Sequence, residues 1–449
     1  MEEKNLKKRF VSNASWQMAQ QIYSMILSLI IGSISARYLG PNNYGLLNYG
    51  ESLISLMATL TGLGLDEVIM NELVMKKDKT GTLLGTALVM RLLASIVGVF
   101  AVAAIIITLE PGNKLLWVIT ILQTFQLFGN LYYVFNYWFQ VELKSKYVSI
   151  AYIIGLTVSG VWRVVILMKN ASVEFFAMTA SIQGIVVLLI VAACFFSISH
   201  EKLHFEKNVA KQLIRKSYHF IISGIAIMIY MQMDKVMIGK MLGEEQLGYY
   251  SAASKVANLW IFVPRALINS ARPLIIEGKK IDEEKNSNSE YKNRLVKSVF
   301  GISMLGLFVG LCFTFLGWIP VRVLYGTAYS SAVPVLAILI WSTSLSQLGT
   351  INGIWIVTEG YNRLLKYTVW MGAFVNLALN YILIRIYGIT GAAIATFMAQ
   401  FTVQFIGPAC IPSLRKYFEV YTSAFREIFN IKYYINAVRK KFQLGEKND

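Results

Sequence analysis

Charged residues are scarce in this chain. Asp, Glu, Lys and Arg make up 15% of its 449 residues, whereas hydrophobic residues make up 56% and the mean hydropathy is +0.54. A soluble globular domain contains about 25% charged residues, so the deficit excludes that class and predicts an integral membrane protein. Cysteine is scarce too. The three cysteines, Cys194, Cys312 and Cys410, all lie in apolar segments, which argues against a disulfide framework.

Motifs typical of enzymes are also lacking. The three histidines are His200, His204 and His219, and nothing near them completes a metal site of the usual kind. The sequence has no Walker A pattern, no cysteine pair and no Gly-x-Ser-x-Gly elbow. We therefore predict a protein that is not an enzyme, has no cofactor or metal ion, and is not driven directly by ATP.

Long apolar runs are abundant. A run of about 20 apolar residues is enough to span a bilayer as a helix. Twelve such runs lie at 12–37, 45–65, 82–108, 115–139, 147–168, 173–198, 217–239, 248–271, 295–317, 330–357, 364–385 and 391–411. The predicted fold class is therefore an all-α integral membrane protein with about twelve transmembrane helices.

Lysine and arginine are distributed unevenly between the spans. With both termini placed in the cytoplasm, 30 of the 42 lie in cytoplasmic segments and six in the outer loops. This agrees with the positive-inside rule and predicts a multi-pass protein of the cell (inner, cytoplasmic) membrane. It also explains the net charge of +17 without a nucleic-acid partner. The first run is too long for a signal peptide, so we expect a retained helix; there is no lipidation motif.

A nine-residue pattern occurs twice. Residues 37–45 (RYLGPNNYG) and 240–248 (KMLGEEQLG) both read cation-x-Leu-Gly-x4-Gly, at an offset of 203. A second match, Trp followed four residues later by Glu, occurs at 138–142 and 355–359, at an offset of 217. A polar insertion at 277–293 lies where the offset grows. The agreement between the matches indicates an internal duplication.

The duplication predicts two lobes of six helices. Because six is even, both lobes face the same way across the membrane and are related by a pseudo-two-fold axis along its normal, around a central cavity. We expect the first, second, seventh and eighth spans to line that cavity. The expected division is an N-terminal lobe at 1–199, a basic cytoplasmic linker at 200–216, a C-terminal lobe at 217–412 and an amphipathic or disordered cytoplasmic tail at 413–449.

The chain resembles the polysaccharide-transporter branch of the multidrug/oligosaccharidyl-lipid/polysaccharide exporter superfamily, which includes the Wzx-type flippases. The resemblance rests on the two lobes, the repeated Leu-Gly-x4-Gly motif and the pair Asp234-Lys235 just before its second copy. The resemblance covers about residues 10–412. It implies translocation of an undecaprenyl-pyrophosphate-linked oligosaccharide from the inner to the outer leaflet. It also implies membrane lipids as partners, with a polymerase and other glycan-assembly proteins as further candidates.

A polar ladder along the eighth span is the first candidate for substrate binding. Its members are spaced three or four residues apart, which places them on one helical face; the polar ones are Ser251, Lys255, Asn258, Arg265 and Asn269. Charges inside a membrane are costly and are functional candidates by default. The repeat partner in the second span is polar but uncharged as far as Asp66. The alternative for such stripes is helix packing.

Other charges lie inside the predicted spans. Arg91 is deep in the third span, where it could either line a substrate cavity or form a structural ion pair. Arg163 and Lys235 are near outer helix ends, where they could either bind substrate or extend their charged groups to the membrane interface. The excess of cations suits an anion such as pyrophosphate. Asp234 and Glu51 are candidates for coupling to a proton or sodium, although the membrane potential alone is a third possibility.

An aromatic cluster lies near the inner end of the fourth span: Tyr132, Tyr133, Tyr137 and Trp138. An interfacial belt is its ordinary interpretation and sugar stacking the sharper one. Two other functions stay open for the chain: a cation-coupled multidrug exporter of the same superfamily, against which the cations argue, and a membrane enzyme of glycan assembly, against which the short outer loops argue.

Overall fold

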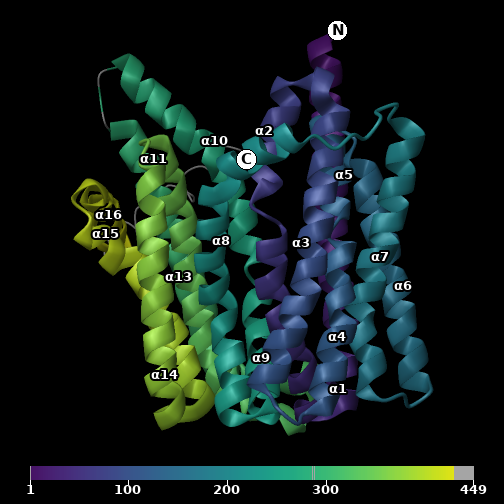
Figure 1. The fold of residues 1–449 in the computed structure, drawn as a ribbon. Helices are drawn as coiled ribbons and strands as arrows, with labels where there is room; N and C mark the ends of the chain where they lie inside the picture. Colours follow the sequence, from purple (N-terminus) through teal and green to yellow (C-terminus); the bar gives the residue numbers. More distant parts are fainter. Residues whose placement is uncertain (1, 286, 288, 429–449) are drawn as a thin grey trace, which may run out of the picture. The chain divides into compact units, whose positions relative to one another are not determined.

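The computed structural model describes residues 2–285, 287 and 289–428. These residues form helices and no strand (Figure 1), in agreement with the predicted all-α class. The α-helices are α1 (Glu2–Thr61), α2 (Leu65–Met75), α3 (Thr80–Leu109), α4 (Lys114–Gly129), α5 (Tyr132–Val141), α6 (Ser145–Met168), α7 (Val173–Ile198), α8 (Lys207–Leu242), α9 (Glu244–Leu259), α10 (Phe262–Lys285), α11 (Ser289–Leu316), α12 (Trp318–Tyr325), α13 (Ala332–Thr358), α14 (Asn362–Phe401), α15 (Gly407–Cys410) and α16 (Phe418–Ile428).

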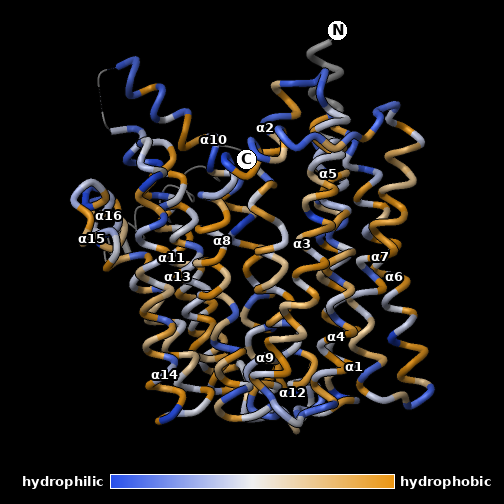
Figure 2. The backbone as a smooth tube through the Cα atoms, viewed as in Figure 1, coloured by the Kyte–Doolittle hydropathy of each residue, from blue (hydrophilic) through white to orange (hydrophobic). Residues whose placement is uncertain are grey.

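Ten helical segments of the described chain are long and apolar enough to cross a membrane. Two of them each contain two predicted spans, because α1 turns at Gly40 and α14 turns at Gly388, where the backbone leaves helical geometry. A Cβ built on Gly391 would lie 2.5 Å from the carbonyl carbon of Leu383, which is possible only where the chain reverses. The ten segments therefore hold the twelve runs. Hydrophobic residues fill the middle of the helices and hydrophilic ones gather near their ends (Figure 2).

The chain divides into two compact units. Unit 1 is Met1–Ala252 with Val321–Ser331, and unit 2 is Ala253–Pro320 with Ala332–Asp449. Unit 1 contains α8, which belongs to the predicted second lobe, because α8 packs against α1, α2 and α3. The six-plus-six division describes a duplication of sequence and stays a prediction, as does the central cavity between the lobes.

The first glycine of the repeated motif adopts the same backbone conformation in both copies. Gly40 has φ 70° and ψ 173°, and Gly243 has φ 88° and ψ 174°. This region of φ and ψ is open essentially to glycine alone. Both glycines turn the chain between two long helices, which is why the motif needs a glycine at this position.

The second glycine of each copy packs against the backbone of the other copy. A Cβ built on Gly45 would lie 2.5 Å from the carbonyl carbon of Glu244, and one built on Gly248 would lie 2.8 Å from that of Pro41. Pro41 and Glu244 occupy the same position in the two copies, so the contact is reciprocal. Only glycine allows backbones to approach this closely.

The cation that opens each copy caps the carbonyl end of another helix. Arg37 donates to the carbonyl of Leu324 at 2.9 Å, at the end of α12. Lys240 donates to the carbonyl of Leu109, at the end of α3, and lies 3.4 Å from Glu110. Cations are favourable there because the last carbonyls of a helix lack intrahelical partners. The two motif copies therefore tie together one end of unit 1.

The predicted eighth span is broken in the structure. Helix α9 ends at Leu259 and α10 begins at Phe262. Pro264 has no N–H and cannot donate to the carbonyl of Trp260, so the ladder of helical hydrogen bonds is interrupted. The prediction of one continuous polar face from Ser251 to Asn269 is therefore wrong: its residues lie on two helices.

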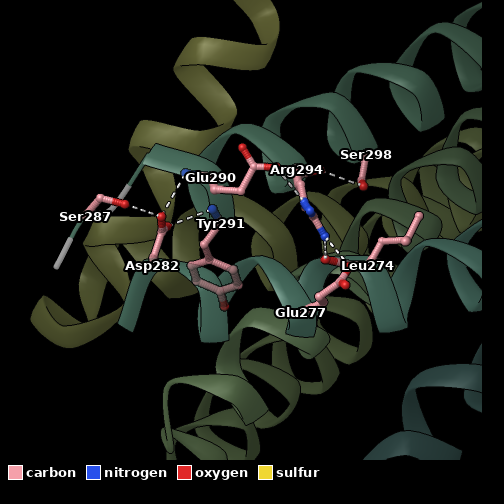
Figure 3. Close-up of polar contacts among 8 residues, drawn as sticks. All are labelled: Leu274, Glu277, Asp282, Ser287, Glu290, Tyr291, Arg294 and Ser298. Atoms are coloured by element: carbon pink, nitrogen blue, oxygen red, sulfur yellow. Dashed lines mark hydrogen bonds and ion pairs between the residues drawn. The ribbon is translucent and has the colours of Figure 1, made fainter. Parts of the chain in front are cut away.

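In unit 2, the described residues of the polar insertion at 277–293 belong mainly to the end of α10 and the start of α11, which form the two arms of a hairpin (Figure 3). The Asp282 carboxylate accepts hydrogen bonds from the Ser287 hydroxyl at 2.5 Å and from the backbone amides of Tyr291 at 2.8 Å and Glu290 at 3.1 Å. These bonds, the one from Ser287 most of all, lower the pKa of the Asp282 carboxyl from its usual value.

Arg294 joins the two arms of this hairpin. Its guanidinium contacts Glu290 on α11 at 2.9 Å and Glu277 on α10 at 2.8 Å (Figure 3). It also donates to the carbonyl of Leu274 at 2.6 Å. The described part of the insertion thus extends α10 and α11.

The described part of the predicted tail packs on unit 2. Tyr417 and Tyr421 are buried, and their rings lie 5.2 Å from Trp355 and 5.0 Å from Phe405. Helix α16 is amphipathic, as predicted, but its apolar face contacts α11 of the protein. Residues 429–449 of the predicted tail lie outside the described residues.

Candidate functional site

A cavity of about 640 Å³ lies within unit 1. It is lined by the ends of α1 and α2 and by parts of α3, α4, α5 and α8. Its polar lining residues are Ser55, Thr59, Thr61, Asp66, Arg91, Ser95, Gln126, Asn130 and Tyr133. Most of its remaining wall is apolar or glycine. Such a volume is in the usual range for small-molecule sites, about 300–1,000 Å³.

The polar stripe predicted for the second span provides one wall. Ser55 and Thr59 lie four residues apart and share a face of α1. Gly62 lies in the turn that follows and Asp66 lies on α2, and all four residues line the cavity. The earlier part of the stripe differs. Asn48 is buried and donates to the carbonyl of Tyr44 on its own helix, at 2.6 Å. The stripe therefore has a packing part and a cavity part.

Arg91 is held in the opposite wall. It lies eleven residues into α3, about 16 Å along the helix, and is only 4% exposed. Its guanidinium contacts the Asp66 carboxylate at 2.8 Å and the carbonyl of Gly62 at 3.1 Å. Asp66 also accepts a hydrogen bond from the Tyr137 hydroxyl. Arg91 therefore lines the cavity and forms an ion pair, whereas its predicted role in binding substrate stays a prediction.

The aromatic cluster divides between core and cavity. Tyr132, Tyr137 and Trp138 are buried in the core of unit 1, so the interfacial belt is wrong for these three. Tyr133 is 39% exposed and lines the cavity. Its ring stacks on Tyr132 with centroids 4.3 Å apart, and the Arg91 guanidinium lies 6.0 Å from its centre.

The residues predicted on the eighth span lie elsewhere. Lys255, Asn258, Arg265 and Asn269 are exposed residues of unit 2, and Ser251 is buried in unit 1. None of the five lines the cavity of unit 1. Their role toward substrate stays a prediction.

Asp234 and Lys235 are partly engaged by the protein. Asp234 is 5% exposed and accepts a hydrogen bond from the Tyr250 hydroxyl. Lys235 contacts the side chain of Gln232 at 3.2 Å. The predicted roles of Asp234 in coupling and of Lys235 in binding stay predictions.

Arg163 and Glu51 interact with each other. Arg163 is half-buried on α6, and the carboxylate of Glu51, which is exposed on α1, acts on it electrostatically. An acid partner explains how a cation is tolerated in this span without a ligand. Neither residue lines the cavity of unit 1.

The sequence reasoning missed Gln126 and Asn130. They lie four residues apart at the end of α4, so both face the cavity. An i, i+4 pair of amides in an apolar run was the available signal. It also missed that Asp66 reaches Arg91, because a pairing across 25 residues has no local signature.

Comparisons with known proteins agree on one family. The profile of the family described as "Polysaccharide biosynthesis protein" matches residues 10–269. A Haloferax volcanii protein named "Probable low-salt glycan biosynthesis flippase Agl15" is 27% identical over 218 residues, which are 49% of this chain and 45% of that relative. The Staphylococcus aureus "Capsular polysaccharide biosynthesis protein CapF" is 22% identical over 87% of this chain and 96% of its own length.

The fold also has a solved counterpart. The inward-facing structure of a multidrug resistance MATE family transporter of the MOP superfamily superposes with a TM-score of 0.69. It is 14% identical and is matched over 91% of this chain and 99% of its own length. At this identity the likeness concerns the fold alone, an all-helical membrane transporter fold.

Proposed function

Since this chain belongs to the polysaccharide biosynthesis protein family, we propose that it is a flippase for a lipid-linked glycan. In detail, it translocates an undecaprenyl-pyrophosphate-linked oligosaccharide repeat unit from the cytoplasmic to the outer leaflet, for surface polysaccharide assembly. The observation that carries the proposal is a polar cavity inside a bundle of apolar helices, with a buried arginine in its wall. The names of the two relatives support the same class of substrate.

The proposed mechanism is alternating access of two lobes. The lipid tail remains in the bilayer while the polar part crosses between the lobes. Lys255 and Arg265, with Asn258 and Asn269 beside them, hold the pyrophosphate, which Arg binds bidentately and Lys as a point charge.

The membrane potential favours outward movement of an anion. Moving one elementary charge through the membrane is worth about 2.3 kcal/mol per 100 mV. An uncompensated pyrophosphate with two charges would therefore gain roughly 4–5 kcal/mol per 100 mV. The gain falls if the binding cations travel with it, because they return with the empty carrier.

A flipping assay in reconstituted vesicles tests the proposal. The double variant Lys255→Ala, Arg265→Ala should lose translocation of undecaprenyl-pyrophosphate glycolipid while it inserts normally. Lys280→Ala, which removes an exposed lysine from the hairpin of unit 2, is the matched control and should behave as wild type. Undiminished flipping by the double variant would overturn the binding role. Export of cationic drugs without any glycolipid flipping would favour the multidrug exporter instead.

A further inference from the structure

We propose that the cavity of unit 1 is a sugar subsite that holds the glycan part of the lipid-linked substrate and not its pyrophosphate. The inference rests on the proposed function and deepens it. It separates the polar part of the substrate into two pieces, with the anion on Lys255 and Arg265 and the sugar in the cavity.

The charge of the cavity is the first argument. Arg91 is its one cation among the lining residues, and it is paired with Asp66 at 2.8 Å. The other polar lining side chains are hydroxyls and amides, so the formal charge of the wall is zero. A pyrophosphate would meet the Asp66 carboxylate, 63% exposed, and like charges repel. A neutral sugar meets no such penalty.

The hydrogen-bonding capacity of the wall is the second argument. Within the described chain, the structure records no hydrogen bond from the side-chain amides of Gln126 and Asn130 to another residue. Amides both donate and accept, as do sugar hydroxyls, whereas a phosphate oxygen only accepts. The open groups therefore match a polyol.

The shape of the wall is the third argument. Tyr133 offers a partly exposed ring that is fixed in place by stacking on Tyr132. Gly62 and Gly224 are also in the lining and leave space because they have no side chain. An aromatic ring beside fixed hydrogen-bonding groups is a suitable surface for the apolar face of a pyranose. The volume, 640 Å³, leaves room for more than the contact groups alone.

Binding measurements on the full chain in lipid nanodiscs test the inference. The probes are undecaprenyl pyrophosphate and its derivatives that carry one glucose, one galactose or one N-acetylglucosamine, with affinities measured by native mass spectrometry. At least one derivative should bind about tenfold tighter than the bare lipid, which is the effect of one or two hydrogen bonds. Gln126→Ala and Asn130→Ala should each reduce this preference about three- to tenfold.

Matched variants separate the sugar site from general damage. Asn136→Ala removes an amide from α5, the helix of Tyr133, outside the cavity lining, and should keep the preference. Tyr133→Phe should keep it as well, because the ring remains, whereas Tyr133→Ala should lose it.

Three results would overturn the inference. The first is equal binding of all four lipids by the wild type. The second is a loss of affinity for the bare lipid, in Gln126→Ala and Asn130→Ala, as large as the loss for the sugar derivatives, since that would place the pyrophosphate in the cavity. The third is binding of none of the lipids, which would overturn the proposed function too.

Discussion

Replacing Gly45 by alanine should force apart the two copies of the repeated motif. The added methyl would lie 2.5 Å from the carbonyl carbon of Glu244 and still closer to its carbonyl oxygen, so reaching the 3.4 Å of an ordinary van der Waals contact requires an opening of more than about 0.9 Å. For Gly248→Ala the distance to the carbonyl carbon of Pro41 is 2.8 Å, with the carbonyl oxygen again closer, so the opening must exceed about 0.6 Å. Both neighbours are backbone atoms, so no side chain can swing away.

Overpacking of this kind costs about 1–3 kcal/mol, and alanine recovers up to about 1 kcal/mol of helix propensity. We expect a net loss of roughly 2 kcal/mol for Gly45→Ala and less for Gly248→Ala. The matched control is Gly32→Ala in the same helix, where an added Cβ meets nothing within 4 Å. It should be neutral or slightly stabilising.

Thermal unfolding of the purified protein in detergent is the assay. The midpoint for Gly45→Ala should fall about 2–4 °C below wild type, because the unfolding entropy of about 2.1 cal/mol/K per residue is large for a chain of this length. Because both methyls enlarge the same gap, the double variant should lose less than the two single losses together. If both single variants were as stable as Gly32→Ala, the reciprocal contact would not exist as described. Strictly additive losses would mean that the two glycines act at separate places.

The remaining predictions concern the ion pair of the cavity, the docked helix α16 and the hairpin of unit 2. Asp66→Ala should destabilise unit 1 by about 1–3 kcal/mol, which is at or below the 3–5 kcal/mol of a fully buried pair because Asp66 is 63% exposed. Adding Arg91→Leu should restore part of this loss. A double-mutant cycle with no coupling energy would count against the ion pair. Tyr421→Ala should lower the free energy of unfolding by about 3–5 kcal/mol and make α16 sensitive to limited proteolysis. Thr422→Ala, at an exposed neighbouring position, should change neither the stability nor the proteolysis. The lowered pKa of Asp282 means that its contribution to stability is present above the usual Asp pKa of about 3.9 and is lost as the pH falls through the lower folded value. Wild type should therefore lose thermal stability relative to Asp282→Asn as the pH falls below about 4, and parallel curves for the two proteins would refute the role of the carboxylate.

The membrane fold was predictable because its signals are local. Apolar runs of about 20 residues identify spans, and the turns at Gly40 and Gly243 follow from a motif that needs glycine in two places. The second-span stripe also predicted part of the cavity wall, since Ser55 and Thr59 share a helical face by spacing alone, whereas Asp66 reaches the same cavity from the next helix, α2. The family resemblance rested on the same short motifs and agrees with the family match.

The errors have a common cause. The continuous polar face of the eighth span failed at Pro264, whose effect depends on whether the chain bends or breaks there. Tyr132 and Trp138 were placed at an interface because aromatic residues near a span end have that default, but neighbouring helices bury them. The segment that contains α16 was predicted only as an amphipathic or disordered cytoplasmic tail, because its sequence shows no more than that one face is apolar. The periodicity of the helix does not show which surface, protein or membrane, covers its apolar face.

The sequence by itself determined that the chain crosses the membrane, where its helices lie and which charged residues would be costly if they faced lipid. These features follow from each segment's own composition, because the bilayer acts on each segment separately. Only the tertiary structure decided that Arg91 meets Asp66, that Gly45 meets Glu244 and that Gln126 and Asn130 share a cavity with Tyr133. Those pairings join residues of different helices, and their energies depend on distance and on exclusion of water, which exist only once the helices have packed.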